Sequence, residues 1–183
     1  MKARRKLILA GVTVAAAALL LASAGFAALS KNTTAPNFKA ATLTGKQFEL
    51  QDLRGRVVLL DFWATWCPPC RNEAPQLQKL WEKYKDKGLV VIGIALDSGD
   101  DAALRKFAAD NELTYWLVND RSGAIAAKYR IGPIPTTYIV SPSGAISQVH
   151  IGFAPGMEKD FDREIKALLP APGELQNFKP LGT

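Results

Sequence analysis

The sequence is poor in side chains that bind transition metals. Its 183 residues include two cysteines, one histidine and two methionines, one of which is Met1. A zinc site needs about four ligands, and a copper carrier needs several soft ones. The only histidine, His150, lies far along the chain from Cys67 and Cys70. We therefore expect no metal and no cofactor, although a copper or haem chaperone remains an alternative that tight Cu(I) binding at the cysteine pair would support.

The two cysteines are spaced Cys67-Pro68-Pro69-Cys70, and residue 71 is Arg. The motif therefore lacks the Cys-x-x-Cys-His arrangement of covalent haem attachment. A passive disulfide would close a loop of only two residues, and such a loop removes little entropy from the unfolded chain. The remaining interpretation is a redox-active pair.

Acidic residues are absent from residues 1–30, and residues 7–29 carry no charge at all. About 20 apolar helical residues span a bilayer, and a basic flank marks the cytoplasmic side. The run is either an uncleaved membrane anchor, which its length favours, or a signal peptide with a small-x-small cleavage site at Ala22-Ser23-Ala24. Both interpretations place the main domain outside the cytoplasm. No cysteine follows the run closely, which argues against a lipoprotein.

The net charge of +6 does not indicate nucleic-acid binding. Four of these charges come from Lys2, Arg4, Arg5 and Lys6, which leaves about +2 for residues 31–183. A domain with almost no net charge lacks the positive surface that binds the phosphate backbone of nucleic acids. We divide the chain into a signal peptide or anchor (1–30), a linker (31–36), one domain (37–169) and a C-terminal tail (170–183).

Two continuous apolar runs, 57–63 and 89–96, are typical of strands buried on both faces of a sheet. Between them, apolar residues recur at three- and four-residue spacing, which predicts a helix over 69–86 that Gly88 ends. The other predicted elements are a hairpin over 42–50 with its turn at 44–46, helices at 101–110, 122–129 and 157–169, and strands at 115–118, 136–140 and 145–151. This order predicts an α/β fold, a central mixed β-sheet flanked by helices on both faces.

The predicted strand–Cys-x-x-Cys–helix order suits redox chemistry. Cys67 lies where the helix begins, so free N–H groups and the helix dipole favour its thiolate. Pro68 and Pro69 fit the first helical turn, where no N–H bond is lost. We expect Cys67 to attack a disulfide and the more buried Cys70 to resolve the mixed disulfide.

Residues 61–75, Asp-Phe-Trp-Ala-Thr-Trp-Cys-Pro-Pro-Cys-Arg-Asn-Glu-Ala-Pro, resemble the active-site segment of thioredoxin-like proteins of the TlpA/ResA family. Ile134-Pro135-Thr136-Thr137-Tyr138-Ile139-Val140, followed by Pro142-Ser143-Gly144, resembles the cis-proline segment of that family. The hairpin region also resembles its extra N-terminal element. The resemblance spans roughly 36–169. It implies a thioredoxin fold with an extra N-terminal β-hairpin and the activity of a thiol–disulfide oxidoreductase.

The resemblance also implies substrate-binding residues. Pro135 would be the cis-proline opposite the sulfurs, exposing the backbone of Ile134 to substrate, and Trp66, Pro68 and Pro69 would belong to the docking surface. The plainer alternatives are a trans proline that starts a strand and, for Trp66, an ordinary core aromatic.

Two acids complete the implied site. Asp61 lies at the position of the buried acid of thioredoxins, where many TlpA-like proteins carry Asn. Burial should raise its pKa and let it relay the proton of Cys70. Glu73 matches an acid that tunes the active site of ResA-like proteins. The plainer alternatives are that Asp61 is a structural buried acid and that Glu73 stabilises the helix through its dipole.

The resemblance favours a reductase that acts on exported protein disulfides, with a membrane-borne thiol electron donor. Thr136 stands where dedicated cytochrome c maturation reductants carry Glu, so apocytochrome is one candidate substrate among other exported thiols. A peroxiredoxin-like peroxidase, which would need a Pro-x-x-x-Thr-x-x-Cys motif absent here, and a thiol oxidase remain alternatives. The expected location is the outer face of the cell membrane, or the periplasm if the N-terminal segment is cleaved.

Overall fold

The computed structural model describes residues 28–97 and 100–174, and their core is a five-stranded mixed sheet in the order β5-β4-β3-β6-β7. The strands are β3 (Val57–Trp63), β4 (Leu89–Ala95), β5 (Trp116–Asn119), β6 (Thr136–Val140) and β7 (Ile146–Ile151). The first three run parallel, whereas β6 pairs antiparallel with both β3 and β7. The predicted mixed sheet is confirmed.

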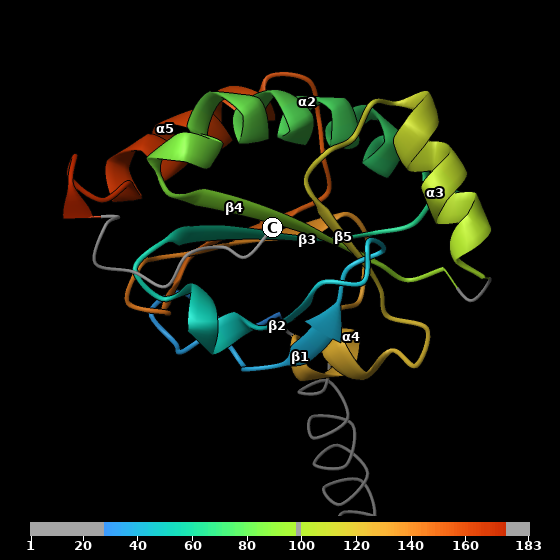
Figure 1. Cartoon of the computed structure of the whole chain (residues 1–183), viewed down its shortest axis with the longest axis horizontal. Helices are drawn as coiled ribbons and strands as arrows, with labels where there is room; N and C mark the ends of the chain where they lie inside the picture. The colour runs from blue at the N-terminus through green and yellow to red at the C-terminus, as the bar shows by residue number, and fades with distance from the viewer. Residues whose placement is uncertain (1–27, 98–99, 175–183) are drawn as a thin grey trace, which may run out of the picture.

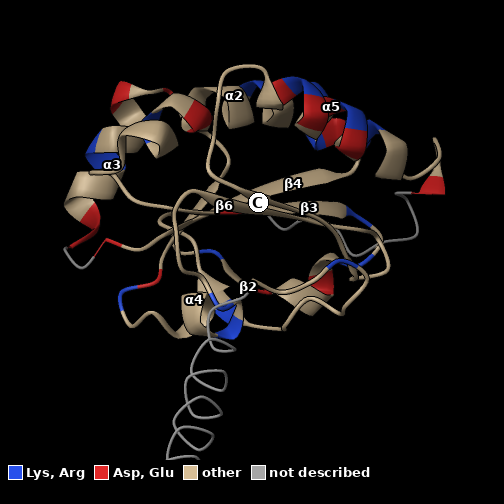
Figure 2. Ribbon diagram, turned by 180° about the vertical axis from the view of Figure 1, so that it is seen from behind, with Lys and Arg blue, Asp and Glu red and all other residues tan. Residues whose placement is uncertain are grey.

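Two layers enclose this sheet (Figure 1). One face is covered by α2 (Pro68–Tyr84), α3 (Asp101–Asp110) and α5 (Met157–Leu168). The other is covered by α4 (Ala124–Lys128), the hairpin of β1 (Lys39–Ala41) and β2 (Gln47–Glu49), and a 3-10 turn at Leu50–Leu53. Both signs of charge alternate along α5 in Figure 2, so this helix presents no surface of one sign.

The central strands supply the core, because every residue of β3 and β4 is buried. Successive side chains of a strand point to opposite faces. Leu59 and Trp63 accordingly belong to the cluster under α2 and α5, whereas Leu60 and Phe62 belong to the cluster under α4 and the hairpin. Strands buried on both faces, as the sequence predicts, therefore hold the two layers together.

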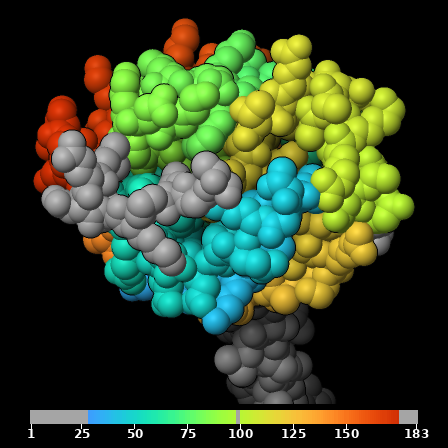
Figure 3. All heavy atoms as spheres, viewed as in Figure 1, coloured from blue at the N-terminus to red at the C-terminus, as the bar shows by residue number. Residues whose placement is uncertain are grey.

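The hairpin begins earlier than the sequence predicts. Its first strand occupies residues 39–41, so starting the hairpin at 42 was wrong, although the turn lies where expected, with Gly45 at φ +89°. The sequence Lys-Ala-Ala has no β-branched residue to mark a strand, and pairing of Lys39 with Glu49 sets the register. The hairpin tip packs against the α3–β5 region (Figure 3), where the Leu43 N–H donates to the Leu117 carbonyl.

The helix after the cysteines ends in two stages. The α-helix stops at Tyr84, a 3-10 turn continues over Lys85–Lys87, and Gly88 follows at φ +100°. Glycine adopts this left-handed conformation without a Cβ penalty. The predicted stop at Gly88 is confirmed, and the strand β4 starts with the next residue.

The N-terminal anchor or signal peptide predicted over residues 7–29 falls almost wholly outside the described residues. Within 28–97 and 100–174, no helix has the length and hydrophobicity to cross a membrane.

Gly93 lets two aromatic side chains pack against the middle of β4. A Cβ at this position would lie 2.8 Å from Leu117 Cδ2, 2.9 Å from Trp63 Nε1 and 3.1 Å from the Tyr115 ring. These atoms belong to the buried interior, where a close-packed environment leaves little room to move. The missing side chain is therefore a requirement of the core under α2.

We predict that Gly93→Ala lowers the free energy of unfolding by about 1–3 kcal/mol, the usual cost of overpacking a core. Urea unfolding of the two proteins would measure the loss. Gly132→Ala is the matched control, because a Cβ there meets nothing within 4 Å. Equal stability of the Gly93 variant and the wild type would contradict the packing argument.

Candidate active site

The two cysteines form a disulfide at the N-terminus of α2, with their Cα atoms 5.3 Å apart. Cys67 is the N-cap of the helix, and its sulfur accepts a hydrogen bond from the Cys70 N–H at 3.4 Å. Cys67 is 4% exposed and Cys70 is fully buried. An incoming thiol or disulfide therefore reaches Cys67 first, as the sequence analysis expects.

The two prolines between the cysteines occupy the first turn of α2. Proline at this place loses no helical hydrogen bond and fixes φ near its helical value. Pro68 is exposed and Pro69 is half-buried. The pair thus stiffens the motif and contributes apolar surface beside Cys67.

The Ile134–Pro135 peptide bond is cis, which confirms the expected conformation. Cys67 Sγ lies 3.9 Å from the carbonyl oxygen of Ile134, so this segment faces the disulfide directly. Pro135 is buried and Ile134 is half-buried. The Thr136 hydroxyl donates to the Pro133 carbonyl at 2.7 Å, and the Gly152 N–H donates to the Pro135 carbonyl at 2.7 Å. These bonds hold the loop against the end of β7.

Two large apolar side chains are exposed: Trp66, next to Cys67 in the chain, and Ile151, at the end of β7. Trp66 is 68% exposed, which rules out the core-aromatic alternative for it. Ile151 is 57% exposed and pairs across the sheet with Thr136, next to the cis-proline. Exposed apolar surface of this kind is typical of binding sites. The sequence analysis did not identify Ile151, because a strand-end isoleucine looks like a core residue.

Asp97 is a second residue that the sequence analysis did not identify. Its carboxylate accepts hydrogen bonds from the Thr65 N–H, at 3.1 and 3.3 Å, and from the Thr65 hydroxyl at 2.6 Å. Trp63 pairs with Ala95 in the parallel ladder, so Thr65 and Asp97 each follow their strand by two residues. Asp97 thereby fixes the loop that presents Trp66 and leads to Cys67.

Below the disulfide lie the two predicted acids, Asp61 and Glu73. Asp61 is 1% exposed at the centre of β3, and Glu73 is fully buried one helical turn after Cys70. The Thr137 hydroxyl donates to Glu73 Oε1 at 2.8 Å, and Thr137 is also the ladder partner of Asp61. Both Asp61 oxygens and Glu73 Oε2 lack hydrogen-bond partners among the described residues. The structure brings both acids together beside Thr137.

Burial is the main cause that raises the pKa of both carboxyls, because a charged carboxylate loses its hydration. For Asp61 the pKa lies well above 3.8, and the neighbouring Glu73 charge raises it further. For Glu73 burial raises the pKa from 4.5 to about 7, against the opposing effect of the Thr137 hydrogen bond. A group of this kind can hold or release a proton near neutral pH.

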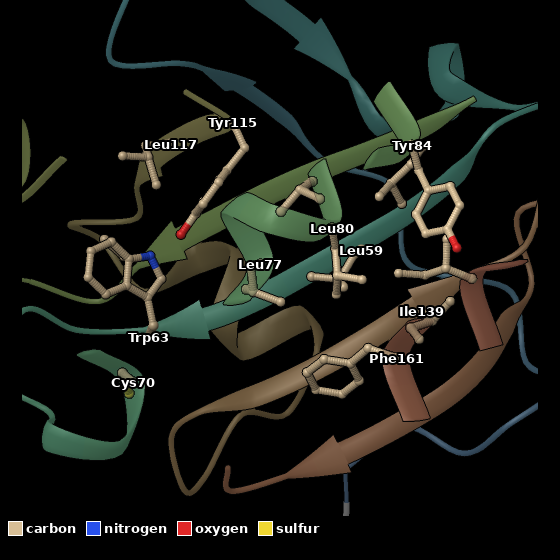
Figure 4. Packing of buried hydrophobic residues seen from close by; sticks show 14 of the residues in the cluster. Leu59, Trp63, Cys70, Leu77, Leu80, Tyr84, Tyr115, Leu117, Ile139 and Phe161 are labelled. Atoms are coloured by element: carbon tan, nitrogen blue, oxygen red, sulfur yellow. The ribbon is translucent and has the colours of Figure 1, made fainter. Parts of the chain in front are cut away.

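Trp63 and Tyr115 extend this polar cluster on the side of β4. Figure 4 shows the Tyr115 hydroxyl and the Trp63 indole nitrogen pointing toward one another, with Cys70 below. Both polar atoms are buried without a hydrogen-bond partner among the described residues. The pKa of Tyr115 is raised well above 10 by burial and by the charges of Asp61 and Glu73. Tyr115 therefore keeps its proton.

Within residues 28–97 and 100–174, no three His, Cys, Asp or Glu side chains gather as metal ligands. The site described above consists of a disulfide, an apolar rim and a buried acid pair, a set suited to thiol–disulfide exchange.

Comparison with known proteins gives the same picture. Residues 32–149 match the AhpC/TSA family. The chain is 42% identical over 120 residues to the thioredoxin-like protein YneN of Bacillus subtilis, covering 64% of this chain and 69% of that protein. It is 38% identical over 118 residues to the thiol-disulfide oxidoreductase ResA of Bacillus anthracis, covering 64% and 68% respectively.

Among solved structures, a Chlorobium tepidum protein provisionally assigned as the thiol:disulfide interchange protein DsbE superposes with a TM-score of 0.72. It is 33% identical, and the match covers 78% of this chain and 99% of that one. The thioredoxin-like fold with its extra N-terminal hairpin is thereby confirmed.

We predict that the oxidised protein loses stability as pH rises from about 4.5 to about 7. Folded Glu73 keeps its proton up to about 7, whereas the unfolded chain releases it near 4.5, so the folded state binds more protons in this interval. Glu73 alone contributes about 3 kcal/mol to this loss. Urea unfolding across this range would measure it, and Glu73→Gln should make the profile less steep without flattening it, because folded Asp61 also has a raised pKa. A variant profile identical to the wild type would contradict the assignment.

We also predict that Thr137→Val raises the pKa of Glu73 further, because the substitution removes the hydrogen bond that stabilises the carboxylate. Carbon-13 NMR titration of the Glu73 carboxyl would measure the change. Thr136→Val is the control, since that hydroxyl donates to Pro133 instead. A lowered or unchanged pKa in the Thr137 variant would refute the prediction.

Proposed function

The chain belongs to the AhpC/TSA family of thioredoxin-like thiol–disulfide oxidoreductases, and on this basis we propose that it reduces disulfides of exported proteins with Cys67 and Cys70. The observation that carries the proposal is the position of the disulfide, which lies at the helix start, 3.9 Å from the Ile134 carbonyl and above two buried acids. Such a site offers an attacking sulfur, a backbone edge for substrate and a proton acceptor.

The first step uses Cys67 of the reduced protein. Its thiolate, stabilised by the N-terminus of α2, attacks one sulfur of the substrate disulfide. A Cys67–substrate bond forms, the substrate disulfide breaks, and one substrate thiolate leaves. The Ile134 backbone beside Cys67 is the surface on which an extended substrate segment would pair.

The second step uses Cys70, which is buried and must lose its proton first. Glu73 lies three residues later on the same helix face, with Asp61 on the neighbouring strand. In this proposal the acid pair accepts the Cys70 proton. The Cys70 thiolate then attacks Cys67 Sγ, the Cys67–Cys70 bond forms, and the second substrate thiolate leaves. Two electrons have passed from the protein to the substrate.

Substrate docking is assigned to the apolar rim. Trp66 and the half-buried Ile134 lie beside Cys67 and would contact apolar residues that flank a substrate cysteine. Pro68 and Pro69 extend this rim along the first turn of α2.

The reducing direction and the location rest on the N-terminal segment and on the family resemblance. We propose that residues 1–30 export the domain and, if uncleaved, anchor it, that residues 31–36 link it, and that residues 170–183 form a tail. Outside the cytoplasm, a membrane-borne thiol carrier would restore the dithiol. Disulfides of exported proteins, with apocytochrome c as one case, are the proposed substrate class.

A second candidate is peroxide reduction, since the matched family is named AhpC/TSA. The names of the similar proteins and the two-cysteine site favour disulfide exchange. Rapid turnover of hydrogen peroxide by the reduced protein would favour the peroxidase.

We predict that the Cys67/Cys70 pair has a reduction potential near that of thioredoxin, about −270 mV, or lower. Equilibration of the soluble domain with dithiothreitol or glutathione buffers would measure it. A potential near the oxidising end, about −120 mV, would overturn the reductase and indicate a thiol oxidase.

We predict that Cys70→Ser accumulates a mixed disulfide between Cys67 and its substrates, because the resolving thiol is absent. Non-reducing electrophoresis with mass spectrometry of exported proteins would identify them. Cys67→Ser is the matched control and should trap nothing. Equal trapping by both variants would contradict the assigned order of attack.

A further inference from the structure

A row of paired residues crosses all five strands beneath α2. Asp61 of β3 pairs with Gly93 of β4 and with Thr137 of β6. Gly93 pairs in turn with Leu117 of β5, and Thr137 pairs with His150 of β7. Directly paired residues point to the same face of a sheet. The row therefore leads from the buried acids to the edge strand within one layer of the protein.

The row ends at the only histidine of the chain. His150 Nε2 lies 2.8 Å from Glu164 Oε2 of α5, and the His150 ring packs edge-on against Phe161, with ring centroids 4.9 Å apart. The side chains of His150 and Glu164 are 17% and 14% exposed. Asp61 and Thr137 are each 1% exposed. The His150–Glu164 pair is thus the place where this polar row meets solvent.

We propose that His150 and Glu164 form the solvent end of a proton path that leads from Cys70 through Glu73 and Thr137. The proposal rests on the thiol–disulfide exchange described above and adds the route by which its proton leaves. The acids have no exit of their own, because Glu73 is fully buried and Asp61 nearly so.

Two links of this path are hydrogen bonds in the structure, Thr137 to Glu73 and His150 to Glu164. Glu73 and the Thr137 hydroxyl are already hydrogen-bonded at 2.8 Å. A hydroxyl both donates and accepts, so Thr137 can reverse its bond when Glu73 gains a proton. Paired side chains on adjacent strands have Cβ atoms about 5 Å apart, which places His150 beside Thr137. An imidazole can take a proton at one nitrogen while it releases another to a carboxylate.

The proton balance is as follows. When Cys70 attacks Cys67, its thiol proton passes to Glu73, then along Thr137 and His150 to Glu164 and to solvent. The departing substrate thiolate takes up a proton from solvent, so the overall exchange neither gains nor loses one. Reduction of the protein disulfide sends the proton along the same path in the opposite direction.

Neighbouring charged groups have other partners. On α5, Asp162 accepts hydrogen bonds from Lys83 and Tyr84 of α2, and Arg163 pairs with Asp160. On the strand side, the group that faces His150 is the neutral Thr137. Glu164 is therefore the carboxylate that serves His150.

Stopped-flow tryptophan fluorescence would test the path. The reduced protein is mixed with increasing oxidised glutathione until the rate no longer rises with concentration, so that the plateau reports the attack of Cys70. We expect His150→Gln to lower the plateau about tenfold or more, with the second-order rate of Cys67 attack and the reduction potential unchanged. Added imidazole should restore the plateau of His150→Ala.

Two further variants sharpen the test. Glu164→Gln should lower the plateau as well while it keeps a hydrogen-bonding group beside His150, and it serves if the histidine variants do not fold. Gln148→Ala is the matched control, because Gln148 lies two residues earlier on β7 and pairs with the apolar Ile139. Its plateau should equal that of the wild type.

Two outcomes would overturn the path. If His150→Gln reaches the same plateau rate as the wild type, the proton leaves Glu73 by another route. A parallel change in attack rate, potential and plateau, without rescue by imidazole, would show that His150 only holds α5 on the sheet. An oxidising potential in the wild type would refute the reductase direction alone, because the plateau comparison does not depend on direction.

Discussion

Burial of β3 on both faces is the constraint on which the rest of the site depends. Every residue of this strand except Asp61 packs into one of the two clusters, so the strand is fixed along its length. The chain leaves the sheet at Trp63 and enters α2 at Pro68, with only four residues between. Because both flanking elements are held by the core, Cys67 is held too. A short loop tied to Asp97 then determines where Trp66 and the first sulfur point.

The same burial makes negative charge costly in the site. Asp61 in the centre of β3 and Glu73 on α2 are two neighbouring carboxyls that are almost completely withdrawn from water. Their raised pKa values follow from lost hydration more than from any specific partner. The fold thus carries groups that cost stability when ionised, and in the proposed mechanism these groups accept the proton of Cys70. Under this proposal, stability and function both depend on the protonation of one small cluster.

Sheet topology connects that cluster to the surface. Antiparallel β6 lies directly beside β3, begins one residue after the cis-proline and carries Thr137. This strand and the loop that enters it therefore contribute the backbone that faces Cys67 and the hydroxyl that binds Glu73. The next strand, β7, brings His150 to the end of the polar row. In the proposed mechanism, substrate docking beside Ile134 and proton movement through Thr137 would use neighbouring residues of one segment.

The sequence by itself determined the parts that depend on local pattern. Continuous apolar runs predicted β3 and β4, helical spacing predicted α2, and the Cys-Pro-Pro-Cys motif predicted the redox pair and its order of attack. The start of the hairpin was missed because Lys39–Ala41 has no strand signal of its own. Only the tertiary structure showed that Thr137 bonds to Glu73 and pairs with Asp61, that Asp97 holds Thr65, and that His150 pairs with Thr137. These contacts join residues far apart in sequence, 64 positions in the case of Thr137 and Glu73. They follow from strand order and register, which are set by the packing of the whole sheet and leave no mark in any short segment.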